Sequence, residues 1–355
     1  MDRAPRRVPV IALTGHLGAG KTTVLNHLLR RPGARIGVII NDFGAINVDA
    51  ALVSGQIDQA ASISGGCLCC LDDSEGFDAA LEKLTHPRLA LDAVIVEASG
   101  IAEPGALARM IRFSGAEHAR PGGVVDVVDA VEHFATVDPD GRGVPPARYA
   151  VTSLVAINKC DLVPAGHREE HLARIEARVR EANPQVHVVR IERGRLDPEL
   201  VHDVAALEDP PDQLPLGALL REEHERHDGH GRGHGHGHGH GHAAHAASVS
   251  VSRPGPIEPG ALLDLLEDPP VGAYRMKGTI AVRAGAGTRG YVVHVVGRSL
   301  FVASHPAPAT SDLVAIGVDL DPEAVRPRLE AAMVPAEHAD TVALRRLQRW
   351  RRLSL

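Results

Sequence analysis

Apolar positions along the first 206 residues follow two alternating spacings. Short uninterrupted apolar runs predict buried strands, whereas stretches with an apolar residue every three or four positions, such as 168–182, predict amphipathic helices. Alternation of the two is typical of an α/β domain with a doubly wound, mostly parallel sheet and helices on both faces. The predicted strands lie at 8–13, 35–40, 91–98, 122–130, 152–158 and 185–191.

The alternation stops at residue 207, and a second folded region begins at residue 248. The intervening residues combine prolines with a repeat of glycine and histidine, which cannot bury a core and predicts a disordered linker. The apolar runs and two helical stretches that follow predict a smaller α+β domain. The chain is therefore divided into 1–206, 207–247 and 248–355, and the second domain has predicted strands at 248–252, 274–282, 290–296, 299–304 and 312–320 and helices near 259–267 and 322–333.

The last twelve residues, LRRLQRWRRLSL, carry five arginines beside an apolar stripe. Leu344, Leu347, Trp350 and Leu353 recur at three-residue spacing, which places them along one side of a helix. We expect this stripe to dock on the second domain. The alternative is that the basic side of the helix meets an acidic partner surface.

Composition narrows the class of protein. At 355 residues, with 44% hydrophobic and 23% charged residues, the chain is ordinary for a soluble protein of two domains. No apolar run approaches the roughly 20 residues of a membrane span, so a cytoplasmic protein without membrane contact is expected. A net charge of -7 and 3% aromatic residues argue against nucleic-acid binding.

The segment TGHLGAGKTTVLNHLL follows the first predicted strand and opens directly into a predicted helix. It has the spacing G-x-x-x-x-G-K-T of a phosphate-binding P-loop, in which backbone N–H groups curl around the phosphates. Lys21 is expected to reach the β- and γ-phosphates, and the Thr22 hydroxyl to ligate Mg²⁺. The predicted nucleotide-binding residues of this loop are Gly15, Gly18, Gly20, Lys21, Thr22 and Thr23.

The segment LVAINKCDL predicts which base is bound. A carboxylate at Asp161 can accept hydrogen bonds from N1–H and the exocyclic amine of guanine, whereas adenine presents an acceptor at N1. Lys159 is expected to cover the base, and Asn158 completes the N-K-x-D pattern. After a P-loop in the same predicted sheet, this pattern favours GTP over ATP.

Two further segments supply residues for the γ-phosphate and the metal beside it. The segment VIVEASGIAEP ends a predicted strand at Glu97, the expected catalytic acid beside Mg²⁺ together with Lys21 and Thr22, and turns at Gly100. The segment NDFGAINVDA, with Asp42 at its head, lies where a switch segment is expected. Neither segment offers an evident catalytic glutamine or arginine finger, so we expect slow intrinsic hydrolysis.

Three of the four cysteines lie within the segment SGGCLCC. Cys67, Cys69 and Cys70 offer up to three soft ligands, suited to Zn²⁺, Co²⁺ or Cu⁺ rather than Mg²⁺. The chain has no second C-x-x-C, and such an incomplete set, completed by Asp42, water or a histidine, suits a site that must release its metal. A buried apolar role and a redox pair are the alternatives.

The motifs GHLGAGKTT, NDFG, GGCLCC, EASGIAEP and NKCD, followed by a His-rich linker and YRMKG, resemble the CobW-type family of P-loop GTPases. That family is associated with zinc and cobalt handling and with delivery of metal to client proteins. The resemblance covers nearly the whole chain. It implies that Gly15 to Thr22 bind phosphate and Mg²⁺, that Asn158 and Asp161 bind guanine, and that Cys67, Cys69 and Cys70 hold the cargo metal.

Two positions depart from the family pattern. The family usually has an aromatic residue where His16 stands and a glutamate where Asp42 stands, often with a second acid at the position of Ala45. Asp42 is therefore a shorter candidate ligand. Lys277 in YRMKG matches the C-terminal signature of the family, but the residues alone assign it no physical role.

The histidine tract supports metal binding independently of the family. Nine of the 21 histidines lie between His224 and His245, where flexible glycines allow two or three imidazoles to meet one ion. The candidate ligands in the repeat are His234, His236, His238, His240 and His242.

These observations predict a GTP-hydrolysing metallochaperone that binds GTP, Mg²⁺ and Zn²⁺ or Co²⁺ and delivers the cargo to a client metalloprotein. One alternative is a dedicated activator that inserts metal into a single enzyme. Another is a storage buffer, which would hold several ions per chain and keep them when GTP is hydrolysed. A homo-oligomer is compatible with all three.

Overall fold

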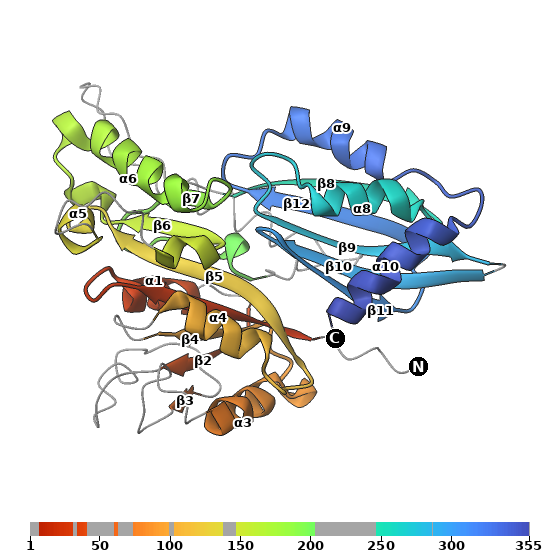
Figure 1. The fold of residues 1–355 in the computed structure, drawn as a ribbon, viewed down its shortest axis with the longest axis horizontal. Helices are drawn as coiled ribbons and strands as arrows, with labels where there is room; N and C mark the ends of the chain where they lie inside the picture. Colours follow the sequence, from red (N-terminus) through yellow and green to blue (C-terminus); the bar gives the residue numbers. More distant parts are fainter. Residues whose placement is uncertain are drawn as a thin grey trace, which may run out of the picture.

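The computed structural model describes residues 7–30, 34–40, 60–62, 74–98, 103–137, 147–202, 246–285 and 287–354 (Figure 1). Within these ranges the chain forms two sheets, one of seven parallel strands and one of five antiparallel strands. Figure 1 shows the first sheet in red to green and the second in cyan to blue. None of the helices in these ranges is both long and apolar enough to cross a membrane.

The first sheet has the strand order β3-β2-β4-β1-β5-β6-β7, and every neighbouring pair is parallel. All six strands predicted for the first domain are present, and the short β3 is an addition that the pattern did not predict. The strands are β1 (Val8–Gly15), β2 (Ile36–Ile40), β3 (Ala60–Ser62), β4 (Ala93–Glu97), β5 (Ala119–Asp129), β6 (Leu154–Asn158) and β7 (His187–Arg190).

Helices cover both faces of this sheet, because side chains of successive strand residues point to opposite faces. On β1, Ile11 and Leu13 pack with α1, whereas Val10 and Ala12 pack with α3 and α4. The apolar side of α6 lies over β6 through Val155 and Ile157. The helices are α1 (Lys21–Leu29), α3 (Ser74–Thr85), α4 (Pro104–Arg112), the short α5 (His133–Val137) and α6 (Arg168–Ala182).

The second sheet has the order β11-β10-β9-β12-β8, and three helices bury one of its faces in a single apolar cluster. This confirms the predicted α+β region. Alternate residues of β9, including Met276, Ile280 and Val282, belong to that cluster. The elements are β8 (Ala247–Pro254), α8 (Pro259–Glu267), β9 (Arg275–Ala284), β10 (Gly287–Val296), β11 (Ser299–His305), β12 (Thr310–Gly317), α9 (Pro322–Ala332) and α10 (Thr341–Leu353).

The C-terminal stripe docks as expected over most of its length. Leu344 and Leu347 are buried in the cluster of the second sheet, and Trp350 packs against it. Leu353 is the exception, with 62% of its surface exposed. The arginines of α10 also have intramolecular partners, since Arg346 donates to Asp264 and Glu267 on α8.

The two sheets meet at the amino ends of β5 and β6. Tyr274, just before β9, is buried in the apolar cluster of the first sheet rather than the second. Its hydroxyl lies 3.3 Å from Ser153 Oγ, and its ring meets His187 edge-on at 5.1 Å between centroids. Ser153 Oγ in turn bonds the backbone N–H and C=O of Val124. The tyrosine of YRMKG therefore belongs to the junction between the sheets.

Glycine is needed at this junction. Gly123 on β5 has φ of 104°, and a Cβ there would lie 2.8 Å from both Ser153 Oγ and Val296 Cγ1. Nearby, Arg275 Nη1 donates to the carbonyl oxygen of Glu199, and the Arg120 guanidinium lies over the ring of Phe301. The second sheet is thus held at the edge opposite the one at which β1, β4 and β6 end.

Candidate nucleotide site

The loop after β1 has the backbone that its glycines predict. Gly15, Gly18 and Gly20 all have positive φ, and a Cβ on Gly15 would fall on the Val127 carbonyl oxygen. Lys21 begins α1, and its Nζ donates to the carbonyl oxygens of Gly15 and His16 at 3.1 and 3.2 Å. The ammonium is therefore held across the mouth of the loop, where a phosphate would lie against backbone N–H groups.

Asn158, at the end of β6, joins three loops. Its Nδ2 donates to the Ala19 carbonyl in the P-loop at 3.0 Å, and its Oδ1 accepts from the Gly194 N–H at 2.9 Å. Gly194 follows β7, and a Cβ on it would press on Thr23, an exposed residue in the first turn of α1. The asparagine therefore fixes the P-loop against the two loops expected to surround the base.

Lys159 is held by a residue that the sequence did not identify. Its Nζ pairs with Asp129 Oδ2 at 2.6 Å, and Asp129 Oδ1 accepts from the N–H groups of Val131 and Glu132. Asp129 is the last residue of β5, next to Asn158 across the β5–β6 pairing. Its position after an apolar strand was the available signal, but only the pairing of strands identifies its partner.

One carboxylate oxygen of Asp161 remains available as a hydrogen-bond acceptor. Its Oδ1 is buried and has no hydrogen-bond partner among the described residues, while Oδ2 lies 3.6 Å from Arg193 Nε. A buried carboxylate oxygen without a donor is costly unless a ligand supplies one. Guanine offers N–H donors of this kind, so the arrangement fits the predicted base.

Glu97 ends β4 beside the start of α1. The carboxylate is 4% exposed, and its Oε1 accepts from Thr22 Oγ1 at 2.8 Å. The side chains at these two positions present oxygen atoms, the ligand type that Mg²⁺ prefers. The residues present therefore fit a magnesium ion next to the P-loop.

The predicted cargo-metal ligands lie outside the described residues. These are Asp42, Cys67, Cys69, Cys70 and the histidines His234 to His242, and Gly100 lies outside them as well. Within the described part of the chain, no group of three or more His, Cys, Asp or Glu side chains could hold a metal. The fourth cysteine, Cys160, is buried and donates to the Ile157 carbonyl, and burial raises its pKa to about 11.

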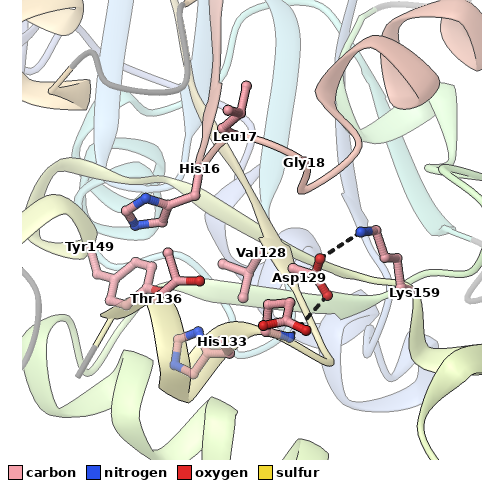
Figure 2. Close-up of a pocket in the computed structure, with 10 residues that line it drawn as sticks. His16, Leu17, Gly18, Val128, Asp129, His133, Thr136, Tyr149 and Lys159 are labelled. Atoms are coloured by element: carbon pink, nitrogen blue, oxygen red, sulfur yellow. Dashed lines mark hydrogen bonds and ion pairs between the residues drawn. The ribbon is translucent and has the colours of Figure 1, made fainter. Parts of the chain in front are cut away.

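A pocket of about 240 Å³ lies beside the P-loop, between His16 to Gly18 and the start of α5 (Figure 2). Lys159 and Asp129 form one wall, and His133 and Tyr149 another. Burial lowers the pKa of His133 to about 4 and raises that of Tyr149, so both are uncharged at neutral pH. Of these four wall residues, only Lys159 was predicted from the sequence as part of the nucleotide site.

Two family models match the chain. The model described as CobW/HypB/UreG, nucleotide-binding domain, matches residues 9–190, and it ends with β7. The model described as Cobalamin synthesis protein cobW C-terminal domain matches residues 246–333, from the residue before β8 to the end of α9. The two matches therefore coincide with the two sheets.

Several characterised proteins are similar to part of the chain. The zinc chaperone YjiA of Escherichia coli (strain K12) is 34% identical over 181 residues, 48% of this chain and 55% of that protein. The zinc chaperone CobW of Pseudomonas aeruginosa is 32% identical over 222 residues, covering 54% and 58%. The zinc-regulated GTPase metalloprotein activator 1 of Dictyostelium discoideum is 28% identical over 226 residues, covering 53% and 46%.

The chain thus spans about half the length of the curated relatives it matches. Among solved structures, the Zn(II)-bound YjiA GTPase from E. coli is 20% identical, with a TM-score of 0.41 over 92% of this chain and 99% of that one.

Proposed function

This chain belongs to the CobW/HypB/UreG family of nucleotide-binding proteins, and from that premise we propose that it is a GTP-hydrolysing metallochaperone. It binds GTP with Mg²⁺ at the carboxyl edge of the first sheet. It carries Zn²⁺ or Co²⁺ on Cys67, Cys69 and Cys70 and passes the ion to a client metalloprotein. The His-rich segment concentrates the ion, and the linker boundaries 207 and 247 belong to the same proposal.

The buried Oδ1 of Asp161, for which the described residues supply no donor, carries the nucleotide part of this proposal. A carboxylate there suits a base that presents two adjacent N–H donors, as guanine does, and would meet an acceptor at N1 of adenine. Asn158 supports the same assignment, because it joins the P-loop to the loop after β7 at the start of the N-K-x-D segment. A glycine loop without a nucleotide-binding role would not need the hydrogen bond from Asn158.

Each residue at the carboxyl edge has a distinct part in hydrolysis. Lys21 places a positive charge on the β- and γ-phosphates, and the backbone N–H groups of Gly18 to Thr22 bind their oxygens. Thr22 and Glu97 hold Mg²⁺, which neutralises charge on the phosphates when bound. Lys159, held by Asp129, covers the face of the base. The sequence offers no evident catalytic glutamine or arginine finger beside the γ-phosphate, so slow turnover is expected.

A cargo of zinc is supported by the names of the relatives, two of which are zinc chaperones. Three thiolates are also soft ligands that prefer Zn²⁺ to Mg²⁺. A second candidate is a dedicated activator of one metalloenzyme, because a third relative is a zinc-regulated GTPase metalloprotein activator. The two candidates share the same chemistry and differ in the number of clients.

Base selection is tested by titrating the full chain with fluorescent GDP, ADP and XDP. We expect GDP to bind most tightly and Asp161→Asn to shift preference towards XDP, since an amide can donate to the oxygen that xanthine carries in place of the amine. Unchanged GDP affinity in the variant would refute base recognition by Asp161.

Metal release is tested by competition with a Zn²⁺ chelator in the presence of a non-hydrolysable GTP analogue, GDP or no nucleotide. We expect tighter Zn²⁺ binding with the analogue, by roughly 5- to 150-fold, because binding linkage is reciprocal. Cys67→Ser and Cys69→Ser should abolish the difference. Equal affinities in all three nucleotide states would leave the storage buffer as the better account.

A further inference from the structure

His16 has two separate attachments in the structure. Its backbone carbonyl accepts from Lys21 Nζ at 3.2 Å and from the Ala19 N–H at 3.2 Å, so it forms the turn of the P-loop. Its ring reaches the other way, and Nε2 lies 2.7 Å from Nη1 of Arg148. Arg148 lies in the 3₁₀ helix Ala147–Val151, well separated in sequence from the P-loop.

Arg148 is itself fixed by Asp126. It makes a forked pair with Asp126 on β5, with Nε to Oδ2 at 2.9 Å and Nη2 to Oδ1 at 2.6 Å. Asp126 is fully buried and also accepts from Thr14 Oγ1 at 2.7 Å. Thr14 is the β1 residue opposite Asp126 in the parallel pairing. The guanidinium therefore has one edge, formed by Nε and Nη2, on Asp126 and its remaining nitrogen, Nη1, on His16.

We propose that Arg148 is a positioning residue for the nucleotide site, which fixes the P-loop through His16 and does so only while His16 is uncharged. The inference rests on the proposed function, because it concerns the loop that binds the phosphates. It adds Thr14, Asp126, Arg148 and His16 to that site as one hydrogen-bonded chain.

The His16 ring must be uncharged because its partner, the Arg148 guanidinium, is a hydrogen-bond donor. A guanidinium can only donate, so His16 Nε2 must accept and the ring proton must be on Nδ1. Protonation would place two N–H donors and two positive charges at 2.7 Å. The charged groups around the ring are Arg148, Lys21 and Asp126, with His133 facing it from α5.

These surroundings set the direction of the pH dependence. Burial lowers the pKa of His16, and Arg148 lowers it further, against an opposing effect of Asp126. Because the attached state binds a proton more weakly than the free state, the attachment is at full strength above about pH 6.5 and weakens as the pH falls below that value. Affinity for nucleotide should follow the same course.

The test compares three substitutions in the full chain by titration with fluorescent GDP at pH 7.5 and 5.5. His16→Gln keeps an acceptor at the same distance from the backbone and does not titrate. His16→Phe keeps a ring and removes the acceptor. Arg148→Lys keeps a charge beside Asp126 and removes the fork. Arg346→Lys, an arginine paired with two carboxylates on α8, is the matched control.

We expect His16→Phe and Arg148→Lys each to weaken GDP binding about tenfold at pH 7.5, which corresponds to about 1.4 kcal/mol. The double variant should be no weaker than either single variant, since both remove one interaction. His16→Gln should bind as the unaltered protein does at pH 7.5. At pH 5.5 the unaltered protein should lose more affinity than His16→Gln, a comparison that cancels titration of the nucleotide itself.

In GTP hydrolysis the same variants should raise KM and leave kcat nearly unchanged, because Thr22 and Glu97 are untouched. Wild-type affinity in His16→Phe, or identical pH profiles for His16→Gln and the unaltered protein, would overturn the proposal. If Arg148→Lys fails to fold, the two His16 variants still decide it. Absence of any guanine nucleotide binding by the unaltered protein would instead overturn the proposed function.

Discussion

Strands β5 and β6 begin and end in very different surroundings. Just before β6 begins, Ser153 Oγ bonds both backbone groups of Val124 midway along β5, and the hydroxyl of the buried Tyr274 lies 3.3 Å from that Oγ. At their carboxyl ends, Asp129 and Asn158 hold loops rather than a second sheet. The same two strands thus connect a packed junction at one edge to a set of polar loops at the other.

The two edges differ in whether their buried polar atoms already have hydrogen-bond partners. At the amino edge a Cβ on Gly123 would already collide with Ser153 and Val296, so the backbone there is closely packed. At the carboxyl edge Asp161 Oδ1 is buried without a donor among the described residues, and a pocket lies beside the P-loop. Close packing characterises the amino edge, and a buried carboxylate oxygen without a donor among the described residues characterises the edge that holds the candidate site.

The largest effect that would test this comparison is at the carboxyl edge. Lys21→Ala removes the charge expected on the β- and γ-phosphates, so GTP turnover should fall to background. The urea midpoint should move much less than for a substitution at the junction. Phosphate release and urea unfolding measure the two quantities, and wild-type turnover would disprove the P-loop assignment.

At the amino edge we expect substitutions to change stability more than GTP turnover. Tyr274→Ala removes a fully buried aromatic ring and should lower the free energy of unfolding by about 3 to 5 kcal/mol. Tyr274→Phe keeps the ring and loses only the contact with Ser153, so a loss of about 1 kcal/mol is expected.

Tyr291→Phe, in the core of the second sheet, is the control for loss of a hydroxyl away from the junction. Urea unfolding of the full chain measures all three variants. A cost for Tyr274→Ala no larger than that of Tyr274→Phe would mean that the junction does not stabilise the first sheet.

A smaller effect is expected from Asp129→Asn. The amide oxygen can still accept from Val131 and Glu132, but the pair with Lys159 is lost. GDP affinity should fall several-fold, up to about tenfold, because Lys159 is then free to leave the face of the base. Unchanged affinity would show that Lys159 needs no partner.

The smallest effect concerns acid stability at the junction. Burial lowers the pKa of His187, which meets Tyr274 edge-on, to about 4. Since the folded state binds the proton more weakly, the contribution is fully present above about pH 6.5 and is lost progressively towards pH 4. His187→Gln should flatten the stability curve in that window, as measured by urea unfolding at each pH, and identical curves would contradict this.

Features that depend on neighbours in sequence could be predicted from the sequence. The glycine spacing around Lys21 specified a loop between strand and helix, and helices 168–182 and 259–267 were found with their observed bounds. Local propensity and apolar spacing act over a few residues, so they are visible without a structure. The short β3 and helices α3 and α4 were not predicted.

The sequence by itself determined the P-loop, the N-K-x-D loop and six of the seven parallel strands, because each depends on residues that are adjacent or nearly so. Only the tertiary structure decided that Asp129 holds Lys159, that Arg148 reaches His16, and that Tyr274 fills the core of the other sheet. These partners are separated by 30, 132 and more than a hundred residues. No local pattern encodes which distant segments the strand crossovers of the first sheet and the junction between the sheets bring together.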